Sequence, residues 1–149
     1  MTAGLGVVST ELELRLVVPG STSLPVRSAL AYDPADPYAV TASFHAGPAS
    51  SEEVVQWTFA RDLLGDGVTA PVGTGDVRVW PATSAPSGGS PVVWLSLSSP
   101  SGKALFEMPL AELVGFLRQT YDVVPIGKES RHVDVDTELA VMLRAEPEP

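Results

Sequence analysis

One segment decides the fold class: Thr10-Glu11-Leu12-Glu13-Leu14-Arg15-Leu16-Val17-Val18, in which leucines alternate with charged residues. Successive side chains of a β-strand point to opposite sides of a sheet, so a period of two places the apolar residues on one face. The opposite face carries the charged side chains of Glu11, Glu13 and Arg15 and is suited to water. The segment therefore predicts a strand of an antiparallel sheet that is buried on one side only.

Six further strands are predicted from the same alternation or from runs of β-branched and aromatic residues. They span residues 26–32, 38–44, 54–59, 77–80, 92–98 and 103–107. Turns rich in Pro and Gly separate them, such as Asp33-Pro34-Ala35-Asp36-Pro37, because each proline fixes its own backbone angle. A single helical turn is predicted at residues 60–64, after the fourth strand, and Gly65 and Gly67 end it.

Helical spacing replaces the alternation after Pro109. Apolar residues between Leu110 and Leu117 recur on one face of a helix, and a loop is predicted at residues 122–129. A last helix, capped by Asp134 or Asp136, carries a second apolar stripe. We therefore expect an α+β fold, with antiparallel sheets of about seven short strands followed by two C-terminal helices.

The length of 149 residues suits one domain, with a core over roughly residues 11–143. Residues 81–91 hold Pro, Gly and Ser without charge and predict a mobile hairpin, and residues 146–149 predict a flexible tail. The longest uncharged run, residues 79–102, is interrupted too often by Pro and Gly to cross a membrane. Because no targeting segment is visible either, we expect a cytoplasmic protein without membrane insertion.

Composition excludes several kinds of site. The sequence has no cysteine, which removes disulfides, thiolate metal sites and cysteine nucleophiles. It has 18 acidic and 9 basic residues and a net charge of -9, which argues against nucleic acid as a partner, because an acidic surface repels phosphate. No Gly-x-Ser-x-Gly segment is present, and Ser43 and His45 share a strand face at a spacing that is common by chance. We expect no catalytic residue and no enzymatic activity.

Two segments have some features of ligand-binding sites. Gly73-Thr74-Gly75-Asp76 lacks the third glycine and the Gly-Lys-Ser/Thr end of phosphate-binding loops, so it predicts a tight turn. His132, Asp134 and Asp136 place three potential donors on one side of an extended segment, which would suit a weak divalent site. Capping of the last helix is the stronger explanation of both aspartates, because free N–H groups and the helix dipole favour acids there. We expect no metal and no cofactor.

The aromatic residues divide into two groups. Trp57 and Phe59 share one strand face and are expected in the core. Trp80 and Trp94 alternate with the apolar residues of their strands and are expected to project away from the main apolar face. Such tryptophans could stack on single-stranded bases or fill a pocket of a partner protein. Cross-strand packing beneath a C-terminal helix is the alternative.

The sequence resembles the SsgA-like family of sporulation-specific cell division proteins of filamentous actinobacteria. The matching segments are LELRLVV (12–18), DPYAV (36–40), WTFARDLL (57–64), GTGDVRVWP (73–81), LSSPSGKAL (97–105) and VPIGKE (124–129). The first strand and residues 132–136 are most similar to the SsgB-like branch. The resemblance covers nearly the whole chain, roughly residues 11–143.

The resemblance implies a non-enzymatic adaptor that helps to recruit or position the tubulin-like protein FtsZ at sporulation septa. It implies FtsZ and SsgA-like paralogues as partners, a fold similar to Whirly-type single-stranded nucleic-acid binders, and a homo-oligomer, with a trimer favoured. Binding of single-stranded nucleic acid remains the alternative function, by fold analogy alone.

Five residues are predicted to contact a protein partner: Arg61, Asp62, Asp76, Arg78 and Trp80. They are charged or aromatic residues beside strand ends and turns, where a place in the core is hard to justify. Three of them also have a simpler explanation, because Arg61 and Asp62 could form a local surface pair and Asp76 could shape its turn.

Overall fold

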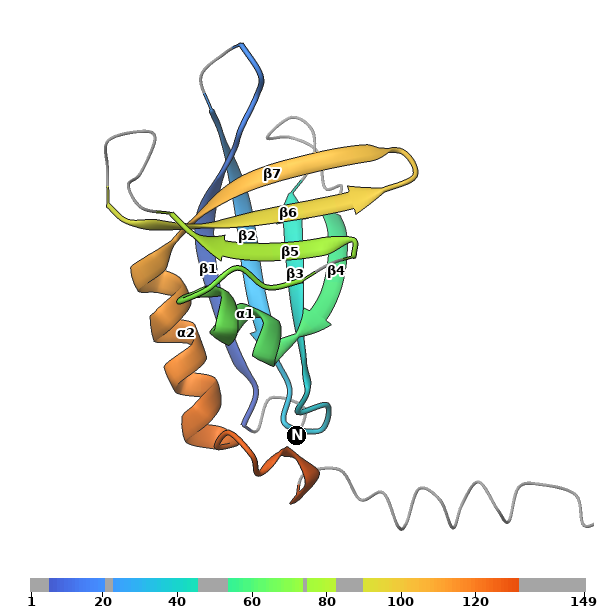
Figure 1. Cartoon of the computed structure of the whole chain (residues 1–149). Coiled ribbons are helices and arrows are strands. Elements are labelled where there is room, and N and C mark those ends of the chain that lie inside the picture. The colour runs from blue at the N-terminus through green and yellow to red at the C-terminus, as the bar shows by residue number, and fades with distance from the viewer. Residues whose placement is uncertain (1–5, 21–22, 46–53, 74, 83–89, 132–149) are drawn as a thin grey trace, which may run out of the picture.

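The computed structural model describes residues 6–20, 23–45, 54–73, 75–82 and 90–131. Within these residues the chain forms seven strands, two α-helices and one 3-10 turn (Figure 1). In chain order they are β1 (Val8–Leu16), β2 (Leu24–Tyr32), β3 (Ala39–His45), β4 (Val54–Ala60), α1 (Arg61–Gly67), β5 (Val77–Pro81), β6 (Val92–Ser99), β7 (Gly102–Pro109), α2 (Leu110–Val123) and the turn Glu129–Arg131. The predicted α+β class is therefore confirmed.

The seven strands form one antiparallel sheet in the order β4-β3-β2-β1-β7-β6-β5. β1 pairs with β2 along its whole length, whereas it pairs with β7 only at Arg15↔Glu107 and Leu16↔Phe106. The sheet bends at this short seam, so that β5–β7 run across the direction of β1–β4 (Figure 1). The result is a curled sheet whose two halves enclose the core between them.

The core forms where the inward side chains of the two halves meet. Leu12 and Leu14 of β1 are buried while Glu11 is exposed, as the alternation predicted. Phe44 of β3 and Phe106 of β7 stack with their ring centroids 5.1 Å apart and so join the two halves of the sheet. Aromatic pairs of this kind stabilise a fold by about 0.5–1.5 kcal/mol beyond the contribution of the apolar area that they bury.

α2 is longer than predicted. Its buried residues are Leu113, Phe116, Leu117 and Thr120. The apolar spacing indicated this face only as far as Leu117, because Thr120 is polar. The hydroxyl of Thr120 donates a hydrogen bond of 2.6 Å to the carbonyl oxygen of Leu117, which satisfies the hydroxyl inside the helix. The helix therefore continues to Val123, past the predicted start of the loop at residue 122.

α1 lies between β4 and β5, so of the two described helices only α2 follows the strands. Of the two predicted C-terminal helices, the first is confirmed as α2, and the last lies outside the described residues. Most of the predicted hairpin at 81–91 and the whole tail at 146–149 also lie outside them. α1 approaches β5 so closely that a Cβ atom at Gly67 would overlap the side chain of Val79. Glycine is required there for packing.

Candidate protein-interaction surface

Arg61, the first residue of α1, lies in the protein interior with 0% of its surface exposed. Its guanidinium donates hydrogen bonds to the carbonyl oxygens of Thr120 (3.2 Å) and Val124 (2.7 Å). It also forms an ion pair with the carboxylate of Glu129 at 2.9 Å. These contacts join the end of β4 to the segment that follows α2.

Two tyrosines complete this interior cluster. The guanidinium carbon of Arg61 lies 4.9 Å from the ring centroid of Tyr32 and 4.9 Å from that of Tyr121. Burial raises the pKa of both tyrosines, although the positive charge of Arg61 opposes this shift. The pKa of Glu129 is lowered, first by a hydrogen bond from its own backbone N–H and then by the one from Arg61. Arg61 and Glu129 are therefore charged together in the folded protein at neutral pH.

The prediction that Arg61 contacts a partner protein does not fit this geometry, because a fully buried guanidinium is not available to one. It does not form a surface pair with Asp62 either, since its ionic partner is Glu129. Sequence reasoning missed Tyr32, Tyr121 and Glu129 because long stretches of chain separate them from Arg61. Asp62 is exposed in the first turn of α1.

Arg78 and Trp80 lie together on the outer face of β5. The guanidinium carbon of Arg78 is 5.9 Å from the ring centroid of Trp80, within the range of a cation–π contact. Trp80 in turn stacks on Trp94 of β6, with ring centroids 6.3 Å apart and an interplanar angle of 25°. Both tryptophans remain partly exposed, so they pack against each other across the sheet and still present surface to solvent. We call Arg78, Trp80 and Trp94 the tryptophan platform.

A hollow of about 360 Å³ adjoins the tryptophan platform. Pro71, Val72 and Gly73 form its other wall. The backbone of Val72 holds this wall in place, because it exchanges two hydrogen bonds with Val79 of β5 (2.8 and 3.0 Å). Asp76, the remaining predicted residue, is exposed just before β5, and its carbonyl oxygen accepts a hydrogen bond from the N–H of Ser98. Asp76, Arg78 and Trp80 are thus close together, as their sequence spacing requires.

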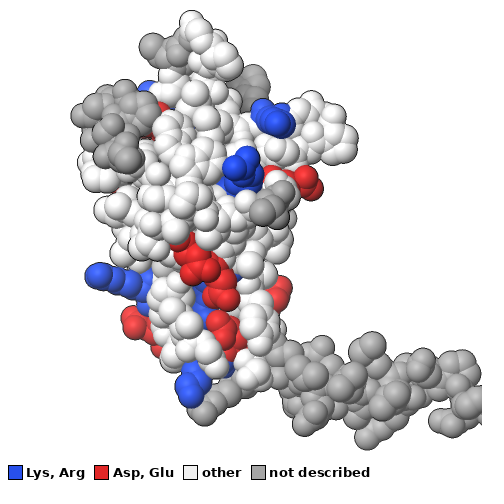
Figure 2. Space-filling model, in the orientation of Figure 1, with Lys and Arg blue, Asp and Glu red and all other residues white. Residues whose placement is uncertain are grey.

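The charges on this side of the molecule are unevenly distributed. Figure 2 shows basic side chains over the β5–β7 strands with an acidic side chain beside them, and most of the acidic side chains below them over the helices, where basic side chains also lie. Arg78 and Lys103 are exposed on β5 and β7, and Asp62 and Asp66 are exposed on α1. A partner that meets this surface therefore encounters a basic aromatic area next to an acidic one.

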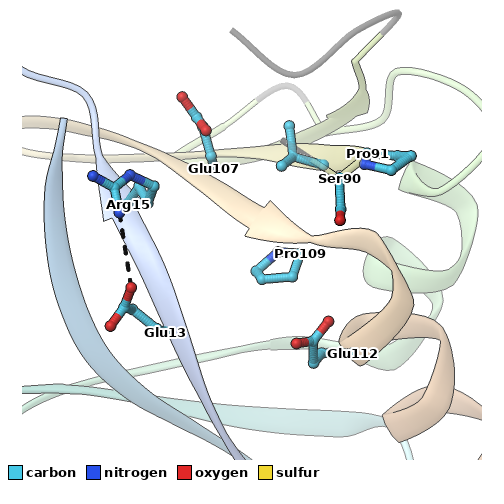
Figure 3. Close-up of a pocket in the computed structure, with 8 residues that line it drawn as sticks. Glu13, Arg15, Ser90, Pro91, Glu107, Pro109 and Glu112 are labelled. Atoms are coloured by element: carbon cyan, nitrogen blue, oxygen red, sulfur yellow. Dashed lines mark ion pairs between the residues drawn. The ribbon is translucent and has the colours of Figure 1, made fainter. Parts of the chain in front are cut away.

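A second hollow, of about 320 Å³, lies where β1, β7 and α2 meet (Figure 3). Glu13 and Arg15 of β1, Glu107 of β7 and Glu112 of α2 surround it. Arg15 lies 3.8 Å from Glu13 and stands opposite Glu107 in the register of the two strands. Because carboxylates outnumber the single guanidinium, this hollow is unsuited to an anionic ligand.

Metal binding finds no support in the described part of the chain, where no group of three or more His, Cys, Asp or Glu side chains is placed to hold an ion. The segment with His132, Asp134 and Asp136 lies outside these residues. Within the same described ranges, no helix has the length and apolar character that crossing a membrane would require.

Comparison with known proteins gives a consistent result. Residues 26–129 match the model of the family described as Streptomyces sporulation and cell division protein, SsgA. Sporulation-specific cell division protein SsgB of Frankia casuarinae is 55% identical over 148 residues, which cover 99% of each chain. The SsgB protein of Streptomyces coelicolor is 55% identical over 136 residues, covering 91% of this chain and 95% of its own.

Two solved structures are similar over most of the chain. A structure from work that relates SsgB mutations to longitudinal cell division during sporulation of Streptomyces coelicolor is 56% identical, with a TM-score of 0.78. It covers 85% of this chain and 94% of its own. The crystal structure of the SsgA-like sporulation-specific cell division protein of Thermobifida fusca is 41% identical, also with a TM-score of 0.78. It covers 91% of this chain and 95% of its own.

Proposed function

The chain belongs to the SsgA family of sporulation and cell division proteins, and from this membership we propose that it is a non-enzymatic adaptor that recruits or positions FtsZ at sporulation septa. Its relatives are named sporulation-specific cell division proteins, which supports a role in sporulation septation. The adaptor function requires a preformed contact surface and no reacting groups. We further propose SsgA-like paralogues as partners, and assembly of the chain into a homo-oligomer, with a trimer favoured.

The tryptophan platform supports this function most strongly. Trp and Arg dominate the binding energy of many protein interfaces, where they are well packed and fully desolvated. Here Arg78, Trp80 and Trp94 stand on adjacent strands of a sheet, so the platform is rigid before a partner binds. Asp62 on α1 and Asp76 just before β5 are exposed charged residues outside the platform. In the proposed complex they would determine the orientation of the bound partner more than the binding affinity.

Co-sedimentation with FtsZ polymers tests this function. We expect the full chain to sediment with the polymers, and we expect Trp80→Ala to weaken binding by about 2 kcal/mol, about 30-fold. Arg78→Ala should weaken binding as well, whereas Arg118→Ala, which removes an exposed arginine from α2, serves as the matched control.

The salt dependence separates this function from the alternative. Contacts centred on aromatic residues keep most of their affinity as salt is raised, whereas binding to single-stranded nucleic acid falls steeply. Absence of the wild-type chain from FtsZ pellets at every salt concentration would refute the adaptor function. Retention of single-stranded DNA at low salt, lost in Trp80→Ala, would favour nucleic-acid binding instead.

A further inference from the structure

β4 forms one end of the sheet and uses only one of its two edges. Its inner edge pairs with β3 from Ala39 to His45, and among the described residues no strand pairs with its outer edge. The strand VVQWTFA has no charged residue and no proline, which are the devices that commonly protect an edge from pairing. β4 therefore offers a row of backbone donors and acceptors to an incoming strand.

The opposite end of the sheet is better protected. Val72 exchanges backbone hydrogen bonds with Val79 on the outer edge of β5. Pro81, the last residue of β5, has no N–H group to donate. Of the two sheet edges in the described chain, the edge of β4 is thus the one suited to adding a strand.

Apolar residues are exposed around the start of β4. Val54 is 44% exposed, Val55 is 45% exposed, and Leu24 at the start of β2 is 50% exposed. Large apolar side chains with this much exposure, gathered at one end of a sheet, indicate a contact surface more than a set of unrelated surface residues. The start of β4 is thus the most apolar part of the edge.

A groove of about 420 Å³ adjoins this part of the edge. Its lining is apolar except for His45 and includes Leu24, Phe44, Val55, Trp57 and Phe106. Val55 and Trp57 belong to both features, because they are residues of β4 and also line the groove. The edge and the groove therefore form one continuous surface.

Strand geometry defines what fits this surface. Side chains alternate across a strand, so Val55 and Trp57 face the groove while Gln56 and Thr58 point to the other side of the sheet. A strand added beside β4 would place every second side chain next to Val55 and Trp57. Its best pattern is apolar at these positions and uncharged polar at the positions between them, as in other cases of strand addition.

We propose that the outer edge of β4 and the adjoining groove bind an extended segment of a partner protein as an additional strand of the sheet. The segment is uncharged and apolar at alternate residues. This inference rests on the proposed adaptor function and names the kind of partner segment that one surface accepts.

Charge and symmetry favour a foreign segment over this chain itself. The sequence after Arg131 carries acids at positions 134, 136, 138, 146 and 148, which match poorly with an uncharged edge and an apolar groove. In a second copy the β5 edge is covered, so only two-fold pairing of β4 with β4 remains, and a two-fold contact closes a dimer instead of the proposed trimer. A neutral partner segment meets neither obstacle.

A capped peptide of four Thr-Val repeats is a direct probe of the edge in the full chain. We expect the outward amides of β4 to exchange roughly tenfold more slowly with the peptide at about ten times its Kd. The same peptide with every amide N-methylated should give no protection, because it has no N–H group to donate to the edge. No slowing of the β4 amides, or slowing only at other strands, would overturn the inference.

Variants test whether the side chains of β4 matter. Val55→Lys should abolish peptide binding, whereas Val7→Lys, at another exposed valine, should leave it unchanged. If Val55→Lys fails to fold, Gln56→Lys provides the same edge charge from the opposite face. Peptide binding that both β4 variants retain would overturn the inference.

The same measurements show whether this chain's own residues or a second copy occupy the β4 edge in place of a partner segment. Outward β4 amides that are already protected without peptide at every protein concentration would assign the edge to this chain's own residues. Protection that appears only at high protein concentration, together with a dimer that Val55→Lys dissociates, would assign it to a second copy. Either result overturns the inference. Failure of FtsZ co-sedimentation alongside peptide protection would refute the proposed function while supporting the edge as a binding site for a different partner.

Discussion

Replacing Glu129 with glutamine keeps the shape of the side chain and removes the charge that faces Arg61. The guanidinium of Arg61 is 0% exposed and would keep only the carbonyl oxygens of Thr120 and Val124 and one neutral amide oxygen as acceptors. Removing one partner of a buried ion pair costs about 3–5 kcal/mol, because the other charge is left uncompensated. Since the glutamine oxygen can still accept a hydrogen bond, we expect a loss of about 3 kcal/mol, or about 10 °C in Tm.

The effect depends on pH in a defined direction. The pKa of Glu129 is lowered from 4.5 in the folded protein, so its contribution is fully present above pH 4.5 and is lost as the pH falls through the folded value. In strong acid the wild-type carboxyl is protonated and resembles the glutamine. The stability difference between wild type and Glu129→Gln should therefore be largest at neutral pH and shrink below pH 4.5.

Urea unfolding followed by tryptophan fluorescence measures both effects. Glu112→Gln, at an exposed glutamate of α2, is the matched control and should change stability by less than about 0.5 kcal/mol. The double variant Arg61→Met/Glu129→Gln should lose less than the sum of the two single variants, because it buries no unpaired charge. A loss below about 1 kcal/mol at neutral pH, or equal losses at neutral and acid pH, would refute this account of the cluster.

Gly67→Ala should destabilise the chain by about 1–3 kcal/mol in urea unfolding, because its methyl group overlaps Val79. Gly115→Ala is the matched control, since open space surrounds Gly115 in α2, and it should stabilise by about 0.5–1 kcal/mol; equal effects of the two changes would contradict the packing of α1. In a spectroscopic pH titration, Tyr32 and Tyr121 should ionise above their usual pKa of 10.0, and stability should fall as the pH rises through that value, because the unfolded tyrosines lose their protons first. Ionisation of all tyrosines in a single step near 10.0 would count against their burial around Arg61.

The strands were predictable from local pattern, whereas their order was not. Alternation identified β1 and the run of β-branched and aromatic residues identified β4, with boundaries shifted by no more than two residues at any end of either strand. No sequence signal shows that β1 lies between β2 and β7, or that β4 ends the sheet. The order of the strands depends on pairing between segments that are far apart in the sequence. Alternation shows which face of a strand is buried, but it does not show which other strand pairs with it.

The candidate site was predictable to a similar degree. Alternation along β5 and β6 correctly indicated that Trp80 and Trp94 leave the main apolar face, and the structure adds that they stack on each other. The error at Arg61 has a physical cause, since a charged residue is expected at the surface unless a partner neutralises it. That partner, Glu129, comes from a distant part of the chain and is adjacent only once α2 has packed.

The short seam between β1 and β7 has a consequence for how the protein is made on the ribosome. Residues 15 and 16 cannot pair with residues 107 and 106 until these have left the exit tunnel, and only then can the two halves of the sheet join. Contacts between such distant parts of a chain slow folding, because a long loop has to close before they are gained. The β1–β4 half is thus synthesised first and keeps its apolar side uncovered until β7 is available, and exposed apolar surface of this kind promotes aggregation of a nascent chain.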